Sequence, residues 1–157
     1  MKYISVFFLV PALLSAGDFM TGQAARVVIG QVNFTAQDST SPSATQTGAV
    51  SGLAFANNNL FVADSNRVQA APILNRVLIY NNVNGPNGFI PSPTAAIPQG
   101  IRCPVCVGTA NVVLGQPDFI SSSVGLSQNG LRTPTAVASD GQILVVADTD
   151  NNRVLIR

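Results

Sequence analysis

The sequence of 157 residues contains no histidine, no tryptophan and no glutamate, and only 10% of its residues are charged. In soluble domains about a quarter of all residues are usually charged. Without histidine there is no Ser-His-Asp triad, no Cys-His pair and no imidazole-ligated metal. Without glutamate, and with Lys2 as the single lysine, long surface helices lack their usual solubilising residues. The net charge of +1 argues against nucleic acid as a partner.

The first sixteen residues have the layout of a secretory signal peptide. Lys2 supplies the positive start, Ile4–Leu14 is an apolar run, and Ala16 is a small residue at the cleavage position. This run is much shorter than the roughly 20 residues that a membrane-spanning helix needs. We therefore predict a signal peptide over residues 1–16 and a secreted or periplasmic module over 17–157, without membrane association after cleavage.

An internal repeat organises the rest of the chain. Each repeated block is short, rich in valine, leucine and isoleucine, and bounded by turn residues, which is typical of a β-strand. A further pair of strand-like blocks precedes the turns that begin at Ala56 and Asp140. The matched blocks are Arg26–Gln31 with Asn111–Gln116, Gly52–Phe55 with Thr135–Ala138, Leu60–Asp64 with Leu144–Asp148, and Asn75–Ile79 with Asn152–Ile156.

The repeat predicts an all-β fold made of β-propeller blades, each a four-stranded antiparallel sheet. One sheet cannot bury both of its apolar faces, whereas stacking against copies of itself does so. About two blades are expected, with repeat one over about 49–116 and an incomplete repeat two over about 133–157. Eight strands are expected in all. The first of them, Arg26–Gln31, is able to serve as the missing outer strand of the last blade.

The motif Val-Ala-Asp-Thr-Asp-Asn-Asn-Arg-Val-Leu-Ile at 146–156 resembles an NHL repeat. The segment Val-Leu-Gly-Gln-Pro-Asp-Phe at 113–119 is similar to that of secreted bacterial NHL proteins. The resemblance covers residues 26–80 and 109–157, and the first copy departs from it by an insertion within 66–74. It implies a β-propeller, six-bladed or similar, that acts mainly as a binding scaffold. Some relatives are lyases or RNA-binding modules, and the metal-dependent lyases among them need histidine ligands that this chain lacks.

Two blades are fewer than a ring requires, since propellers have at least about four. Two explanations are open. In the favoured one, the chain is part of a longer propeller. In the other, the chain is full length and copies form a homo-oligomer, for example three chains that make six blades.

The Asp148–Asn152 turn has the alternating oxygen ligands that begin a calcium loop. Arg153 stands at the sixth position, where such a loop needs glycine, and no acidic residue follows to close the site. The favoured interpretation is a tight turn in which Asp148, Asp150 and Asn152 have structural roles. Ca²⁺ stays open as the weaker alternative, and no other metal or cofactor is expected.

Arg76 and Arg153 each follow an asparagine and open an apolar strand. A guanidinium at a strand end can hold a carboxylate or phosphate ligand with two hydrogen bonds. It can also pair with the aspartate of its own repeat, Asp64 or Asp148. Recurrence in both copies favours the structural role, since a catalytic group is usually needed once.

Cys103-Pro-Val-Cys106 lies in the long connection 81–108. No helix follows it, residue 107 is valine where haem attachment needs histidine, and the chain has no further cysteine or histidine to complete a zinc site. In an exported protein these two cysteines are expected to form a local disulfide.

These observations predict a non-catalytic binding or scaffold module, and no catalytic residue is assigned. The connections 32–51, 65–74 and 81–108 are expected to recognise a protein or glycan ligand. Gln31 and Gln116 are expected to anchor loops. The alternative function is a fragment of a propeller lyase or hydrolase whose catalytic residues lie in missing blades.

Overall fold

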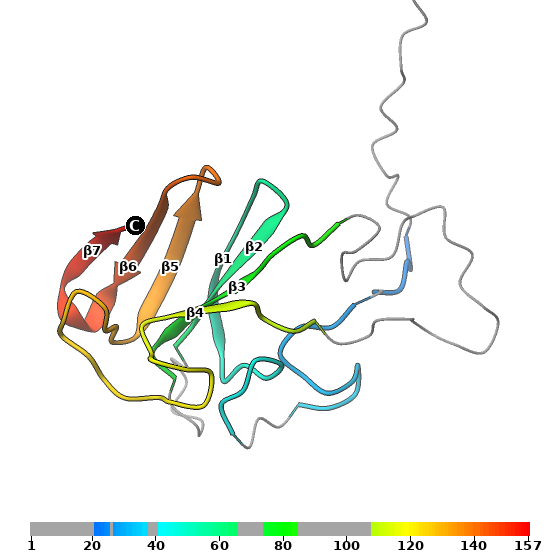
Figure 1. Ribbon diagram of the computed structural model, residues 1–157. Helices are drawn as coiled ribbons and strands as arrows, with labels where there is room; N and C mark the ends of the chain where they lie inside the picture. The colour runs from blue at the N-terminus through cyan, green and yellow to red at the C-terminus, as the bar shows by residue number, and fades with distance from the viewer. Residues whose placement is uncertain (1–20, 26, 38–40, 66–73, 85–107) are drawn as a thin grey trace, which may run out of the picture.

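The computed structural model describes residues 21–25, 27–37, 41–65, 74–84 and 108–157 (Figure 1). These residues form two antiparallel sheets and no α-helix, so the prediction of an all-β chain with about two blades is confirmed. The first sheet has the order β1 (Val50–Ala56), β2 (Asn59–Asp64), β3 (Arg76–Tyr80) and β4 (Val112–Leu114). The second has the order β5 (Pro134–Ser139), β6 (Leu144–Asp148) and β7 (Arg153–Ile156), with the 3-10 turn η1 (Thr149–Asn151) between β6 and β7.

Each hairpin turn follows from its local sequence. Asn57 and Asn58 join β1 to β2 with φ angles of 46° and 62°, the left-handed region that a two-residue hairpin turn requires. Between β5 and β6, Gly141 has φ of 95°, and Asp140 Oδ1 accepts backbone N–H groups two and three residues later. The two turns lie against each other. Gly141 is therefore needed there, because any side chain at position 141 would collide with the Asn57 side chain.

The two sheets pack face to face, with the innermost strands β1 and β5 side by side (Figure 1). Gly52 on β1 permits this approach, since a Cβ there would lie 2.9 Å from the Cα of Ala136. The core between the sheets consists of Phe61, Val77, Leu131, Leu144 and Val146.

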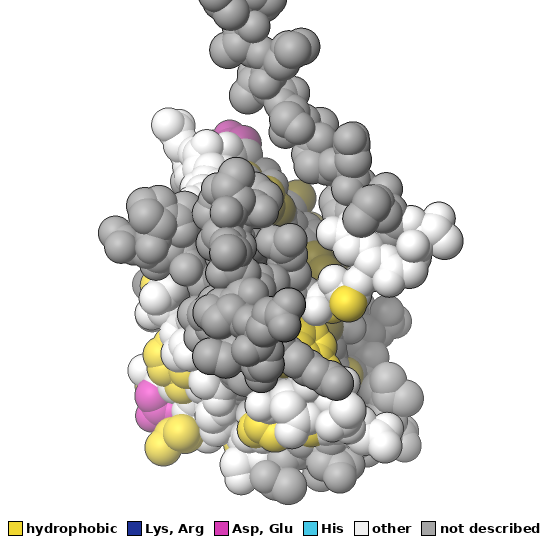
Figure 2. All heavy atoms as spheres, turned by 90° about the vertical axis from the view of Figure 1, so that its right-hand side faces the viewer, with side chains coloured by type: hydrophobic (Ala, Val, Ile, Leu, Met, Phe, Trp, Pro, Cys, Tyr) yellow, Lys and Arg dark blue, Asp and Glu magenta, His cyan; other side chains and the backbone are white. Residues whose placement is uncertain are grey.

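The other face of the first sheet has a core of its own. Val62, Leu78 and Tyr80 are buried there beneath connecting segments, with Ile29 and Phe119 packed against them. In Figure 2, which faces the side of the molecule away from the second sheet, hydrophobic side chains are visible at the surface between residues that are not described. The first sheet is therefore covered on both faces, and the second sheet on one.

The expectation of an eighth strand is wrong for the described part of Arg26–Gln31. Residues 27–31 belong to no named strand. Gly30 makes an isolated parallel bridge with Gln46, and Val28, which is also a bridge residue, accepts the Gly108 N–H at 3.1 Å. The physical reason is that, among the described residues, no strand runs alongside the segment to extend these single bridges into a ladder. Its repeat equivalent makes the same bridge, from Gly115 to Gly130, and the two bridging glycines have φ angles of 92° and 91°.

Candidate functional site

The strand ends bring the four recurring charged residues together in two pairs. Asp64 and Arg76 are opposite each other in the β2–β3 ladder, and Arg76 Nε donates to Asp64 Oδ2 at 2.9 Å. Asp148 and Arg153 are opposite each other in the β6–β7 ladder, and Arg153 Nε donates to Asp148 Oδ2 at 2.7 Å. We call these the first and the second Asp–Arg pair.

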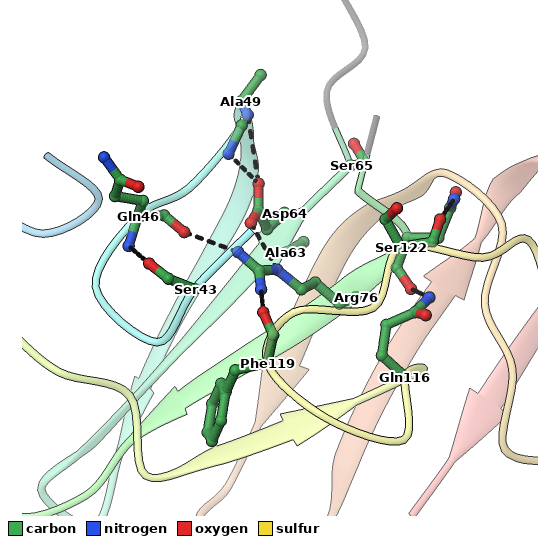
Figure 3. Close-up of polar contacts among 12 residues, drawn as sticks. Ser43, Gln46, Ala49, Ala63, Asp64, Ser65, Arg76, Gln116, Phe119 and Ser122 are labelled. Atoms are coloured by element: carbon green, nitrogen blue, oxygen red, sulfur yellow. Dashed lines mark hydrogen bonds and ion pairs between the residues drawn. The ribbon is translucent and has the colours of Figure 1, made fainter. Parts of the chain in front are cut away.

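The first Asp–Arg pair is fully buried and ties two segments, residues 46–49 and the loop after β4, to one end of the sheet (Figure 3). Asp64 Oδ1 accepts the backbone N–H of Gly48 at 2.9 Å and that of Ala49 at 3.3 Å. The other two nitrogens of Arg76 donate to the carbonyl oxygens of Phe119 and Gln46, both at 2.7 Å. Each of the three guanidinium nitrogens thus donates to the protein, and the side chain is fully buried, so it is not placed to hold a carboxylate or phosphate ligand.

Burial also decides how the groups around this pair ionise. Desolvation raises the pKa of Asp64, and the charge and hydrogen bond of Arg76, with the two backbone amides, offset part of that rise. Burial likewise raises the pKa of Tyr80, and the negative charge of Asp64 raises it further.

The second Asp–Arg pair repeats this plan with more exposure. Asp148 Oδ1 accepts the backbone N–H of Arg132 at 2.6 Å, as Asp64 accepts that of the equivalent Gly48. Arg153 donates to three carbonyl oxygens of the 126–130 segment, at 2.7 to 2.9 Å. Its side chain is 27% exposed, whereas that of Asp148 is fully buried. The same contacts in both copies give these residues an architectural role.

The predicted tight turn after β6 differs in one respect from the expectation. Asp148 accepts the distant backbone N–H of Arg132 and the Asn151 side-chain amide, so its oxygens do not cap the local turn. Asp150 accepts the Thr133 hydroxyl at 2.7 Å, and Asn152 closes the turn in the left-handed region with φ of 51°. Within the described ranges, no three Asp, Glu, His or Cys side chains gather where they could hold a metal ion.

Asn75 connects the two sheets. The sequence showed only that an asparagine precedes the arginine in both copies and did not predict this role. The Asn75 side chain donates to Ser122 O at 3.1 Å and accepts from Thr133 N at 3.0 Å. Its carbonyl oxygen accepts from Gln116 Nε2 at 2.9 Å, which anchors the loop after β4. Gln31, the repeat equivalent of Gln116, has a buried Oε1 with no hydrogen-bond partner among the described residues.

Two of the surface pockets formed by the described residues lie between the sheets. One, of about 460 Å³, opens between β4 and the end of β7, where Leu114, Gly115 and Arg157 line it. The other, of about 220 Å³, lies at the opposite end, near the hairpin turns. We call this second pocket the amide groove, because the side chains around it include Asn59, Asn81 and Gln142.

The remaining predicted features lie outside the described residues. These are the signal peptide at 1–16 and the cysteines Cys103 and Cys106. No helix within the described ranges is both long and apolar enough to cross a membrane.

The fold and its repeated pairs define a protein built of stacked β-sheet blades. Comparison with protein-family models and with curated proteins gives no match for this sequence. The NHL family stays a resemblance carried by the motifs at 113–119 and 146–156.

Proposed function

We propose that this chain is an exported, non-catalytic binding module of the NHL-like β-propeller type, and that it binds at the amide groove. The observation that carries the proposal is the commitment of its recurring charged residues. Asp64, Arg76, Asp148 and Arg153 all hold connecting segments against strand ends. These four charged side chains therefore stabilise the fold. We place ligand binding at the surface around the connections between strands.

The amide groove offers hydrogen-bonding groups beside an apolar floor. The side-chain amides of Asn81 and Gln142 are exposed and make no hydrogen bond within the described residues, and Phe61 and Ile79 form the floor. Arg157 is the one charged residue of its lining. Such a site suits an uncharged polar ligand.

A neutral glycan fits this groove better than a folded protein does. The groove of about 220 Å³ can hold a sugar unit or two, whereas a stable protein interface buries roughly 800 Å² on each partner. Nothing in the described residues specifically favours the lyase or hydrolase alternative.

A printed array of neutral and acidic oligosaccharides tests the proposal. The chain should retain neutral oligosaccharides, and the double variant Asn81→Ala/Gln142→Ala should lose at least tenfold in affinity because both free amides are gone. The matched control is Gln37→Ala/Asn129→Ala, which removes the same two exposed residue types outside the lining of the groove. Absence of glycan retention, or equal retention by the two double variants, would refute the proposal.

A further inference from the structure

The chain contains a single Asn-X-Thr triplet, Asn33-Phe34-Thr35. No other asparagine of the sequence is followed two residues later by serine or threonine. Such a triplet, with any residue except proline in the middle, is the acceptor pattern for an N-linked glycan in an exported protein. Because the pattern is short, the surroundings of the triplet in the fold decide whether an enzyme can use it.

The turn that holds the triplet exposes all three of its residues. Asn33 Oδ1 accepts the Thr35 N–H and the Thr35 hydroxyl, both at 2.9 Å, and the Ala36 N–H at 2.7 Å. Because the side-chain oxygen faces these donors, the amide nitrogen Nδ2 points away from them. Within the described residues, Nδ2 donates no hydrogen bond. The nitrogen to which a glycan is attached is therefore accessible at the surface.

The equivalent turn in the second copy shows that the Thr35 hydroxyl is not needed for the fold. Asp118 takes the place of Asn33, and its Oδ1 accepts the N–H groups of Ile120 and Ser121 at 3.0 and 2.7 Å. Ile120, which has no hydroxyl, stands where the first copy has Thr35. The same turn thus forms without a hydroxyl. Thr35 completes the acceptor triplet, and the turn itself does not require it.

The two turns also differ in how firmly they are held against the first sheet. Phe119, in the middle of the second turn, packs against the core beneath it, and its carbonyl oxygen accepts a hydrogen bond from Arg76. Phe34, its equivalent, is 44% exposed. Among the described residues, the hydrogen bonds of residues 33–36 all lie within that turn. The first turn is therefore open to a large enzyme, whereas the second is tied to the sheet.

We propose that Asn33 is the acceptor of an N-linked glycan, an inference that rests on the proposed export of the chain. The donor is an oligosaccharide joined to a polyprenyl pyrophosphate. Asn33 Nδ2 forms a bond to the anomeric carbon of the first sugar and loses a proton to a base of the transferase. The bond from that carbon to the pyrophosphate oxygen breaks, and the lipid pyrophosphate leaves with the electron pair.

The glycan has a physical consequence at this surface. Val32 and Phe34, the apolar residues on either side of Asn33, are 56% and 44% exposed. An N-linked glycan is bulky and hydrophilic, so on Asn33 it shields both side chains from other molecules. The lining of the amide groove includes none of residues 32–36, and ligand binding there is expected to be unaffected.

Cell-free translation of the full chain with endoplasmic-reticulum microsomes tests the acceptor site. Protection from added protease reports translocation, and a mass increase that a peptide N-glycosidase reverses reports the glycan. The increase expected is that of one glycan.

The variants locate that glycan. Asn33→Gln, which displaces the acceptor nitrogen, and Thr35→Val, which keeps the shape of the side chain without its hydroxyl, should both lose the mass increase. Thr35→Ser keeps a hydroxyl and should retain it. The matched control is Asn129→Gln, at another exposed asparagine, which should be modified like the parent chain.

The two readouts separate this inference from the proposed export. A protected chain without the mass increase, or an increase that persists in Asn33→Gln, overturns the acceptor site and leaves export standing. A chain that is neither protected nor modified contradicts export. The same variants are then translated with the leader of a secreted protein in place of residues 1–16. Absence of the glycan from that protected chain overturns the acceptor site.

Discussion

The two Asp–Arg pairs use the same atoms in different surroundings. Arg76 is fully buried, because the loop after β4 crosses over it and supplies the Phe119 carbonyl. Arg153 is 27% exposed, and its contacts come from the segment that precedes its own sheet. The comparison shows that the Asp and Arg side chains pair in both copies because of their charge and register. Whether the pair is buried depends on the segments packed over it. The energetic weight of the same pair is therefore expected to differ between the copies.

The largest effect is expected from removing each arginine in turn. Arg76→Met leaves Asp64 buried without its counter-ion, which should lower the free energy of unfolding by about 3–5 kcal/mol. Arg153→Met should cost less, about 1–3 kcal/mol, because water reaches that site and Asp148 keeps its bonds from Arg132 and Asn151. Urea denaturation of both variants measures the difference. Equal losses would show that burial does not distinguish the pairs.

The asparagines that precede the arginines should show an intermediate effect. Asn75→Ala removes both side-chain hydrogen bonds between the sheets and leaves the partly buried Ser122 carbonyl and Thr133 amide without these partners, at a cost of about 1–3 kcal/mol. Asn152→Gly should be nearly neutral, since glycine tolerates the left-handed conformation that Asn152 adopts. Thermal unfolding of the two variants is the measurement. A destabilised Asn152→Gly with an unaffected Asn75→Ala would reverse the assignment.

The smallest effect concerns the turns at Asn33 and Asp118, which are repeat equivalents. Each side-chain oxygen accepts backbone N–H groups two and three residues later. The Ser121 hydroxyl and then the Ser121 amide lower the pKa of Asp118 below its usual 3.8. Because the folded-state pKa is lowered, the stabilisation by the Asp118 charge is present above about pH 3.8 and is lost as the pH falls through the folded value.

Replacing Asp118 by asparagine makes this turn like that of Asn33. The melting temperature of Asp118→Asn should fall less steeply than that of the parent chain between pH 4 and pH 2, as followed by circular dichroism. Ser121→Ala, which removes the largest cause of the shift, should have an effect in the same direction. If both variants lose melting temperature between pH 4 and pH 2 as steeply as the parent chain does, the lowered pKa of Asp118 is contradicted.

Local patterns predicted the strands well, because each is a short apolar block closed by turn residues. β3 (Arg76–Tyr80) agrees with the repeated block Asn75–Ile79 to within one residue at each end, and β2 begins one residue before the block Leu60–Asp64. The segment 27–31 was predicted as a strand because its residues match those of β4. It forms single bridges instead of a strand, because a ladder requires a partner strand along its edge, and no pattern within the segment says whether one is present.

The candidate site was predictable only in part. Recurrence of Asp64, Arg76, Asp148 and Arg153 indicated architecture, and their positions beside one another follow from antiparallel register. The segments that they hold could not be predicted, since the carbonyl and amide groups of Gln46, Gly48 and Phe119 carry no signal in the side-chain sequence. The amide groove was missed for a similar reason, because it forms where the ends of two sheets meet.

By itself, the sequence determined the all-β class, the four-strand plan of a blade, the repeat and the charged residues that close each strand end. These follow from local propensity and from periodicity, which act over a few residues. Only the tertiary structure decided which pair is buried, which apolar faces are covered and which are left exposed, and where the amides of separate turns meet. Burial depends on what lies across a sheet face, and that is a property of the packed molecule rather than of any one strand.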